Sequence, residues 1–245
     1  MSWKRIMQSL AGKFGYEITK VRTGEKLPYT WCYPYNSRIY SPWFEDWFQR
    51  IFDKVKDQTK VSEDRCYMIY RFTQHCSHLN GEFAECGVYK GGTAYLIADT
   101  LMKCSENKKE LHLFDTFSGM PKTANEDDSH HIEGDFKDTT LNDVKEYLQK
   151  FYCAIFHYGI IPETFEGLGN KKFSFVHIDV DIYQSVKDCC DFFYDRLIKG
   201  GIIIFDDYGF RGYEKAAKKA VDEFFSDKQE KPVAFRTGQC FVIKL

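Results

Sequence analysis

The chain has 245 residues, 43% of them hydrophobic, and a formal net charge of −2 at pH 7. This length suits one α/β domain with appended elements, and the charge excludes the global basic field of a nucleic-acid-binding protein. No stretch is apolar for long enough to span a bilayer, so we expect no transmembrane segment.

The cysteines indicate a reducing compartment. There are nine of them, scattered along the chain and without a Cys-x-x-Cys pair, which is typical of reduced thiols rather than of structural disulfides. The first ten residues include Lys4 and Arg5 but no long apolar run, unlike a signal peptide. We therefore expect a cytoplasmic protein.

Residues 1–60 predict an N-terminal extension. Glycines and prolines interrupt the first 40 residues, and an amphipathic pattern from Pro42 to about Lys60 predicts a helix. One face of a helix at the start of the chain would carry four apolar side chains, Trp3, Ile6, Met7 and Leu10. We expect this extension to form a lid or a contact in a homodimer, with packing onto its own domain as the alternative.

The main domain, residues 61–245, alternates strands with helices. After a helix from Ser62 to about His78, apolar runs predict strands at 83–86, 111–115, 153–158, 173–179 and 201–206. The segments between and after them predict helices at 93–103, 140–150, 185–197 and 213–225, and residues 233–244 read as a hairpin. This pattern predicts an α/β fold with a mostly parallel seven-stranded sheet and an antiparallel end. Such sheets bind ligands at the carboxyl ends of their strands.

The segment Glu85-Cys-Gly-Val-Tyr-Lys-Gly-Gly-Thr93 follows the first of these strands. Gly87 permits a sharp turn, while Gly91 and Gly92 let the next helix begin close to a ligand with its positive end facing it. The segment is neither G-x-G-x-x-G nor a P-loop, which weakens the dinucleotide and nucleoside triphosphate interpretations. Glu85 at a strand end favours a cationic cofactor or an amino group; a plain tight turn is the alternative.

Two further acids could contact a nucleoside. Asp115 ends the second strand, where a carboxylate can accept hydrogen bonds from ribose hydroxyls; a helix cap or a surface acid is the alternative. Gly134-Asp135-Phe136 and Tyr158-Gly159-Ile160 are candidates for the wall around an adenine.

Four carboxylates, those of Asp179, Asp181, Asp206 and Asp207, follow two buried strands. Like charges repel at such a place, and a hard divalent cation such as Mg²⁺ or Mn²⁺ would resolve the conflict. Strand geometry would point Asp179 and Asp181 to opposite sides, so we expect only one of them to be a direct ligand unless the chain turns there. Capping and salt bridges are the alternative explanation.

Histidines near these segments are weaker candidates. His177 precedes Asp179 by two residues, and a lone histidine on a strand is more often structural than a ligand or base. His130 and His131 lie in the polar stretch 125–133, which is typical of a solvated loop, with a lid over the site as the alternative.

The motifs together resemble the macrocin O-methyltransferase family, which includes macrolide-sugar and novobiocin-sugar O-methyltransferases. The resemblance covers roughly residues 60–245 and rests on four main segments: Glu85–Gly92, Leu113–Pro121, His177–Tyr183 and Phe205–Gly209. It implies a Rossmann-like class I fold, S-adenosylmethionine as cofactor, and Mg²⁺-dependent methylation of a hydroxyl on a sugar or glycosylated small molecule.

The resemblance also implies roles for individual residues. Cofactor contacts would come from Glu85, Gly87, Tyr89, Thr93 and Asp115. The metal would be held by Asp179, Asp206 and Asp207. Some members place a histidine three residues after the first metal aspartate, but that position is Ile182 here. Asp181 is therefore expected to act as the base or as a partner of the ligands.

Other activities remain open at this point. A catechol- or phenol-type O-methyltransferase would use the same motifs on another acceptor. Asp179-Val-Asp181 also matches the D-x-D of metal-dependent glycosyltransferases, although such an enzyme would not need the glycine segment paired with Asp115. A non-catalytic α/β module would have no use for intact carboxylate pairs.

Overall fold

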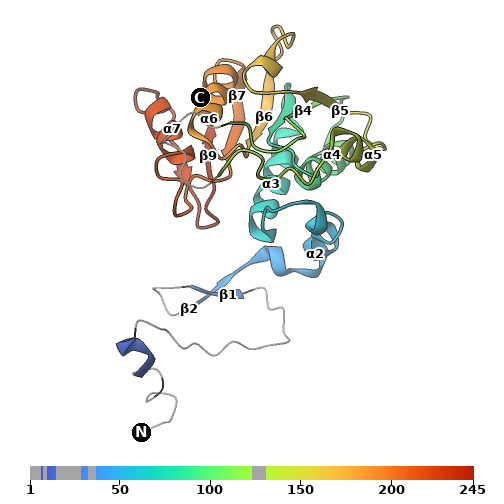
Figure 1. Ribbon diagram of the computed structural model, residues 1–245. Helices are drawn as coiled ribbons and strands as arrows, with labels where there is room; N and C mark the ends of the chain where they lie inside the picture. Colours follow the sequence, from blue (N-terminus) through green and yellow to red (C-terminus); the bar gives the residue numbers. More distant parts are fainter. Residues whose placement is uncertain (1–6, 8–9, 15–28, 33–36, 123–130) are drawn as a thin grey trace. The chain divides into compact units, whose positions relative to one another are not determined.

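The computed structural model describes residues 7, 10–14, 29–32, 37–122 and 131–245 (Figure 1). The chain divides into two compact units, Met1–Glu45 and Asp46–Leu245, so the predicted boundary after residue 60 falls within the second unit. Trp3 and Ile6, which the sequence placed on an apolar helix face, lie outside the described residues. Among the described residues, no helix is long and apolar enough to cross a membrane.

The first unit contains a short hairpin in which β1 (Tyr29–Cys32) pairs antiparallel with β2 (Ser37–Tyr40). A 3-10 turn, η1 (Pro42–Phe44), follows the hairpin. The hydroxyl of Tyr40 donates a hydrogen bond to Oε1 of Glu45 at 2.8 Å. This hairpin replaces the irregular chain that the glycines and prolines predicted.

The second unit begins with α2 (Asp46–Phe52), η2 (Lys56–Gln58) and α3 (Glu63–Cys76). The prediction of one helix from residue 42 to 60 is therefore wrong, because the chain bends after α2 and brings η2 against the start of α4 (Gly92–Cys104). A Cβ on Gly92 would lie 2.7 Å from the carbonyl carbon of Gln58, so only glycine allows this approach. The helix predicted from Ser62 is confirmed as α3.

Seven strands form one sheet in the order β5-β4-β3-β6-β7-β9-β8. Their bounds are β3 (Glu82–Cys86), β4 (Leu111–Asp115), β5 (Ala154–Tyr158), β6 (Phe173–Ile178), β7 (Leu197–Phe205), β8 (Val233–Ala234) and β9 (Cys240–Ile243). The pairs from β5 to β7 are parallel, and β9 pairs antiparallel with both β7 and β8. The predicted mostly parallel sheet with a terminal hairpin is confirmed.

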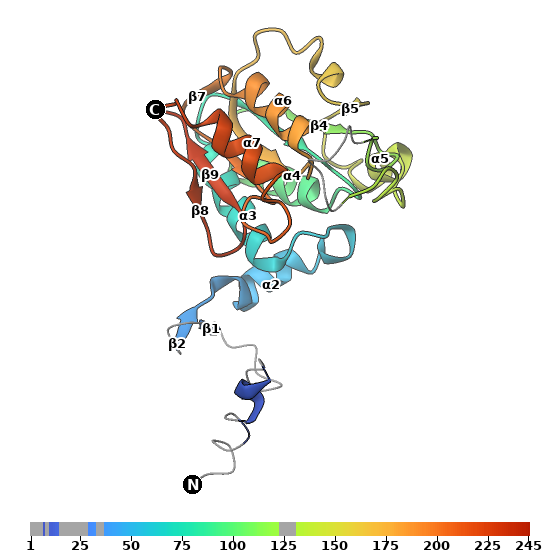
Figure 2. The same cartoon turned by 60° about the vertical axis from the view of Figure 1, so that its left-hand side comes forward.

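Helices cover both faces of this sheet (Figure 2). One face carries α3 and α4 (Gly92–Cys104), and the other carries α6 (Tyr183–Phe193) and α7 (Ala217–Phe224). The main core forms under α6 and α7, where Phe114 and Val176 of the strands pack with Phe193 and Val221. Every residue of β6 is buried, including the polar Ser174 and His177, as expected for a central parallel strand covered on both faces.

The element boundaries predicted around two loops, the one after α6 and the one after β7, are wrong. The sixth helix ends at Phe193, so β7 begins at Leu197 and not at Gly201. The last helix begins at Ala217 and not at Tyr213, because the chain from Tyr208 to Ala216 forms a loop whose Tyr213 side chain turns toward the strand ends.

The carboxyl ends of β4, β3, β6 and β7 lie side by side. The amide of Gly87 donates to the carbonyl of Phe114 at 2.9 Å, and the amide of Asp179 donates to that of Cys86 at 2.8 Å. The strand order reverses around β3, whose neighbours β4 and β6 lie on opposite sides. In a doubly wound sheet, this reversal leaves a crevice in which ligands bind.

Gly87 should tolerate no side chain. Its φ is +87°, and a Cβ there would lie 1.8 Å from the carbonyl oxygen of Asp179. We expect Gly87→Ala to destabilise the fold by more than the strain of its backbone alone, which costs on the order of 1–3 kcal/mol. Urea unfolding should be compared with that of Gly167→Ala, a matched control with φ +82° and nothing within 4 Å. Equal losses in the two variants would contradict the clash.

Candidate active site

A cavity opens at these strand ends, with an empty volume of about 1160 Å³ including its open mouth. Its lining contains eight of the residues that the sequence singled out: Gly87, Tyr89, Thr93, Asp115, Asp179, Asp181, Asp206 and Asp207. Three others, Glu85, Gly91 and Asp135, do not line it. The structure therefore brings the glycine segment and the paired carboxylates into one cavity.

Asp115 shapes the glycine segment. Its Oδ2 accepts the amides of Val88 at 2.6 Å and Tyr89 at 2.9 Å, and its Oδ1 accepts that of Phe117 at 2.6 Å. Tyr89 itself has a φ of +51°, a conformation that these hydrogen bonds help to hold. The carboxylate thus fixes the loop at the cavity wall, while ribose binding by Asp115 stays a prediction.

Glu85 lies on the α3 side of the sheet and is fully buried. Strand alternation places it beside His177, with Oε1 2.9 Å from Nδ1, and Nε2 of His177 lies 3.6 Å from Oδ1 of Asp206. Burial disfavours the charged ring, but the nearby carboxylate of Asp206 and the hydrogen bond with Glu85 raise the pKa of His177 to about 10. The cation that Glu85 faces is therefore a histidine of this chain.

This pairing gives stability a pH dependence. The unfolded imidazole titrates near 6.5 and the folded one has a pKa of about 10, so the bound proton stabilises the fold fully below pH 6.5. The contribution is lost as pH rises through about 10. We expect the urea midpoint to fall over this range, and to fall less in His177→Gln than in the wild type. The exposed-residue variant His78→Ala should follow the wild type, and parallel curves for all three proteins would refute the assignment.

Arg65 is a site residue that the sequence reasoning missed. Its Nη1 pairs with Oδ2 of Asp206, its Nη2 donates to the carbonyl of Lys60 at 3.1 Å, and its guanidinium lies 4.9 Å from the centre of the Phe210 ring. A cation in the first turn of a helix opposes the helix dipole. An arginine at the third position of α3 was therefore a signal for an acidic partner elsewhere in the chain.

Asp206 is held by several groups at once. Besides Arg65 and His177, the amide of the buried Gln239 donates to Oδ1 at 2.7 Å. Burial alone would raise the pKa of Asp206, but His177 and Arg65 lower it below its ordinary value. Both oxygens of this predicted metal ligand are thus engaged by other side chains.

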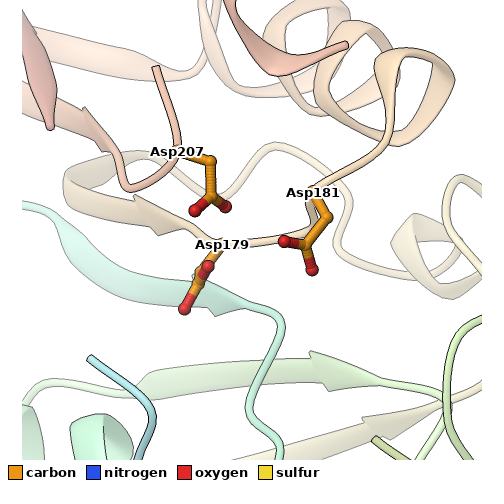
Figure 3. Close-up of side chains that lie close together, drawn as sticks. All are labelled: Asp179, Asp181 and Asp207. Atoms are coloured by element: carbon orange, nitrogen blue, oxygen red, sulfur yellow. The ribbon is translucent and has the colours of Figure 1, made fainter. Parts of the chain in front are cut away.

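Three carboxylates, those of Asp179, Asp181 and Asp207, converge instead (Figure 3). Each brings one oxygen to within 4.8 Å of the others. The expectation that Asp179 and Asp181 point apart is wrong, because β6 ends at Ile178 and Asp181 turns the chain with a φ of +59°. The pKa values of Asp179 and Asp207 are raised well above the ordinary value. Loss of water contact is the main cause, and repulsion from neighbouring carboxylates is the second.

The chemistry of this donor set fits a divalent cation. Clustered carboxylates with raised pKa values gain from a nearby positive charge, and oxygen ligands suit Mg²⁺ or Mn²⁺. The other half of the cavity is lined by the glycine segment and by Asp115, a combination that suits a nucleoside-type cofactor. Phe136, Ile160 and Ile161 add an apolar wall, which partly matches the segments predicted around an adenine.

The loop after residue 130 also reaches the carboxylates, whereas His130 lies outside the described residues. Nε2 of His131 lies 3.2 Å from Oδ1 of Asp181 and 2.8 Å from the hydroxyl of Tyr213. The hydrogen bond with Asp181 raises the pKa of His131. Residue 131 is thus not the solvated loop residue that the polar stretch favoured, and Asp135 binds this loop rather than the cavity.

Comparison with known proteins gives a family match. The family model described as Macrocin-O-methyltransferase (TylF) matches residues 70–234. A curated relative from Streptomyces olivaceus is 8-demethyl-8-(2,3-dimethoxy-alpha-L-rhamnosyl)-tetracenomycin-C 4'-O-methyltransferase. It is 25% identical over 140 residues, which are 52% of this chain and 53% of the relative. The match thus spans about half the length of that relative.

Solved structures share the fold. The O-methyltransferase NovP has a TM-score of 0.68 at 19% identity, over 76% of this chain and 82% of its own. The calicheamicin methyltransferase CalS11 has a TM-score of 0.63 at 17% identity, over 82% of each chain. Structures of this fold include complexes with S-adenosylmethionine and S-adenosylhomocysteine.

These matches confirm the resemblance that the motifs carried. NovP and CalS11 establish the class I methyltransferase fold of the second unit, and the family model covers the part of the cavity lining from Gly87 to Tyr213. Because that model matches more than half of the chain, the protein belongs to the macrocin-O-methyltransferase family.

Proposed function

We propose that the protein transfers a methyl group from S-adenosylmethionine to a hydroxyl of a sugar or glycosylated acceptor, with the help of Mg²⁺ or Mn²⁺. The observation that carries the proposal is one cavity lined by both the glycine segment and the carboxylate cluster. Family membership supports O-methyl transfer. A sugar acceptor is supported by the relative whose described substrate carries a rhamnosyl group.

The cofactor side of the cavity would be formed by Gly87, Tyr89 and Thr93, with Asp115 holding the loop in place. Gly91 is the N-cap of α4 and has a left-handed backbone conformation. The first amides of α4, which have no acceptor within the helix, therefore lie next to the glycine segment. Glu85 would not contact the cofactor directly, because it is buried and does not line the cavity. Its carboxylate instead holds the ring of His177.

The metal side would be formed by Asp179 and Asp207, which already converge. The ligand set that the family resemblance implies also includes Asp206, and its use requires the cation to replace Arg65 at Oδ2. A bound divalent cation would lower the pKa of a coordinated sugar hydroxyl, and the cofactor's sulfonium would supply the methyl group.

Asp181 is the proposed base. Its carboxylate lies in the same cluster as Asp179 and Asp207, so a hydroxyl held there would be within its reach. S-adenosylmethionine bound there would supply the methyl group to the hydroxyl oxygen, and the electron pair of its broken carbon–sulfur bond would stay on sulfur. The hydroxyl proton passes to an oxygen of Asp181.

The decisive experiment measures cofactor binding and turnover separately. Calorimetric titration with S-adenosylmethionine should give similar affinities with and without EDTA, whereas EDTA should abolish methyl transfer and Mg²⁺ should restore it. Nucleotide-linked sugars, rhamnosyl glycosides and catechol would serve as acceptors. Absence of cofactor binding would refute the proposal, and methylation of catechol alone would move the activity to the phenol class.

A further inference from the structure

Two side chains from separate loops hold the carboxylate of Asp181. Its Oδ1 accepts a hydrogen bond from the hydroxyl of Tyr213 at 3.1 Å and lies 3.2 Å from Nε2 of His131. His131 and Tyr213 also contact each other, with Nε2 and the hydroxyl oxygen 2.8 Å apart. Oδ1 of Asp181, Nε2 of His131 and the hydroxyl oxygen of Tyr213 are thus each in polar contact with the other two.

His131 is also held from its other side. Its Nδ1 lies 3.3 Å from Oδ2 of Asp135, and the same oxygen accepts the amide of Ile132 at 3.1 Å. The imidazole centre lies 5.2 Å from that of the Phe136 ring, and the side chain of His131 is only 16% exposed. Each ring nitrogen therefore faces a carboxylate, and the ring has little freedom to turn.

The side chain of Asp181 starts from a turn and not from a strand or helix. This residue lies beyond the end of β6, with a φ of +59°, in a conformation that no strand or helix continues. A misplacement of about 1 Å in a catalytic group can cost on the order of 10²-fold in rate. The side chains that fix its Oδ1 are those of His131 and Tyr213, which come from the two loops.

We infer that His131, oriented by Asp135 and joined by Tyr213, is a positioning residue that holds Asp181 for proton transfer. The inference rests on the proposed function, in which Asp181 takes the hydroxyl proton. It gives Asp135 a role that differs from the predicted cofactor contact, since Asp135 would act through His131. Hydrogen bonds that orient a functional side chain from outside typically change activity by about 10- to 100-fold.

Single-turnover kinetics on the full chain test this role. His131→Ala should slow methyl transfer by about 10- to 100-fold and leave the Kd for S-adenosylmethionine within about twofold of the wild type. Added imidazole should restore part of the rate. Asp135→Asn and Tyr213→Phe, which keep side-chain shape, should each give a smaller loss. The exposed-residue variant His78→Ala should match the wild type. A His131→Ala rate within about twofold of the wild type, or a loss that imidazole leaves unchanged, would overturn the inference.

A second measurement does not depend on turnover. The chain has seven histidines, so ring nitrogen signals can be resolved by NMR and that of His131 assigned with His131→Ala. Asp181→Asn should shift the His131 signal, while Asp227→Asn, at an exposed carboxylate, should not. An unmoved signal would overturn the inference. Failure of the wild type to methylate any acceptor, with the shift observed, would instead count against the proposed function.

Discussion

Asp179→Asn should abolish methyl transfer and weaken Mn²⁺ binding by at least about 100-fold, while S-adenosylmethionine still binds. The carboxylate of Asp179 brings one oxygen to within 4.8 Å of oxygens of Asp181 and Asp207, and its pKa is raised by loss of water contact and by neighbouring acids. Such a group gains most from a cation, and an amide oxygen is a weaker ligand than a carboxylate for a hard ion. Electron paramagnetic resonance of Mn²⁺ would measure the metal affinity directly.

The control for this experiment removes a carboxylate that has no part in the cluster. Asp227 has a side chain that is 76% exposed, lies in a turn after α7 and pairs with Lys228, so Asp227→Asn changes the net charge and that surface ion pair but not the cluster. It should bind Mn²⁺ like the wild type. Wild-type Mn²⁺ affinity in Asp179→Asn would contradict a metal site at the cluster, whatever happens to the activity.

Asp206→Asn separates the two possible ligand sets. If the cation displaces Arg65, this variant should lose Mn²⁺ affinity to a degree similar to Asp179→Asn. If Asp206 instead stays with Arg65, His177 and Gln239, the variant should lose thermal stability and keep its Mn²⁺ affinity. The stability loss would arise because the buried imidazolium of His177 would keep Glu85 but lose Asp206 as a negative partner.

The sheet was predictable because its signals are local. Each buried strand is a short apolar run, and each run is followed by a turn or by the start of a helix. Helix starts are local as well: Thr140 is the N-cap of the helix Leu141–Tyr147, and its hydroxyl accepts the amide of Asp143 at 3.2 Å. The carboxyl-end location of the chemistry-bearing segments then followed from parallel topology, without knowledge of any side-chain contact.

The charge pairing was not predictable, because its partners are far apart in sequence. Glu85 meets His177 across 92 residues, and Arg65 meets Asp206 across 141. No pattern of spacing encodes such pairs, since strand register decides the first and the packing of α3 on the sheet decides the second. The direction of the Asp181 side chain was predicted wrongly for another reason: its left-handed backbone reverses the direction that strand alternation would give.

Asp181→Asn should lower the rate of methyl transfer by about 10²- to 10⁴-fold, the usual contribution of a positioned base. Asparagine has the same shape, and its oxygen can still accept the hydrogen bond from Tyr213, so the loops around it should keep their place. It cannot accept the proton of the hydroxyl. The affinities for S-adenosylmethionine and Mn²⁺ should therefore change little, which distinguishes this variant from Asp179→Asn.

Single-turnover measurement is needed, because product release can mask a change in the chemical step. A rate within about threefold of the wild type would assign the base to another group. A loss of Mn²⁺ affinity as large as that of Asp179→Asn would make Asp181 a metal ligand. His131 and Tyr213 would then orient that ligand, because their contacts with Oδ1 hold the same carboxylate in either role.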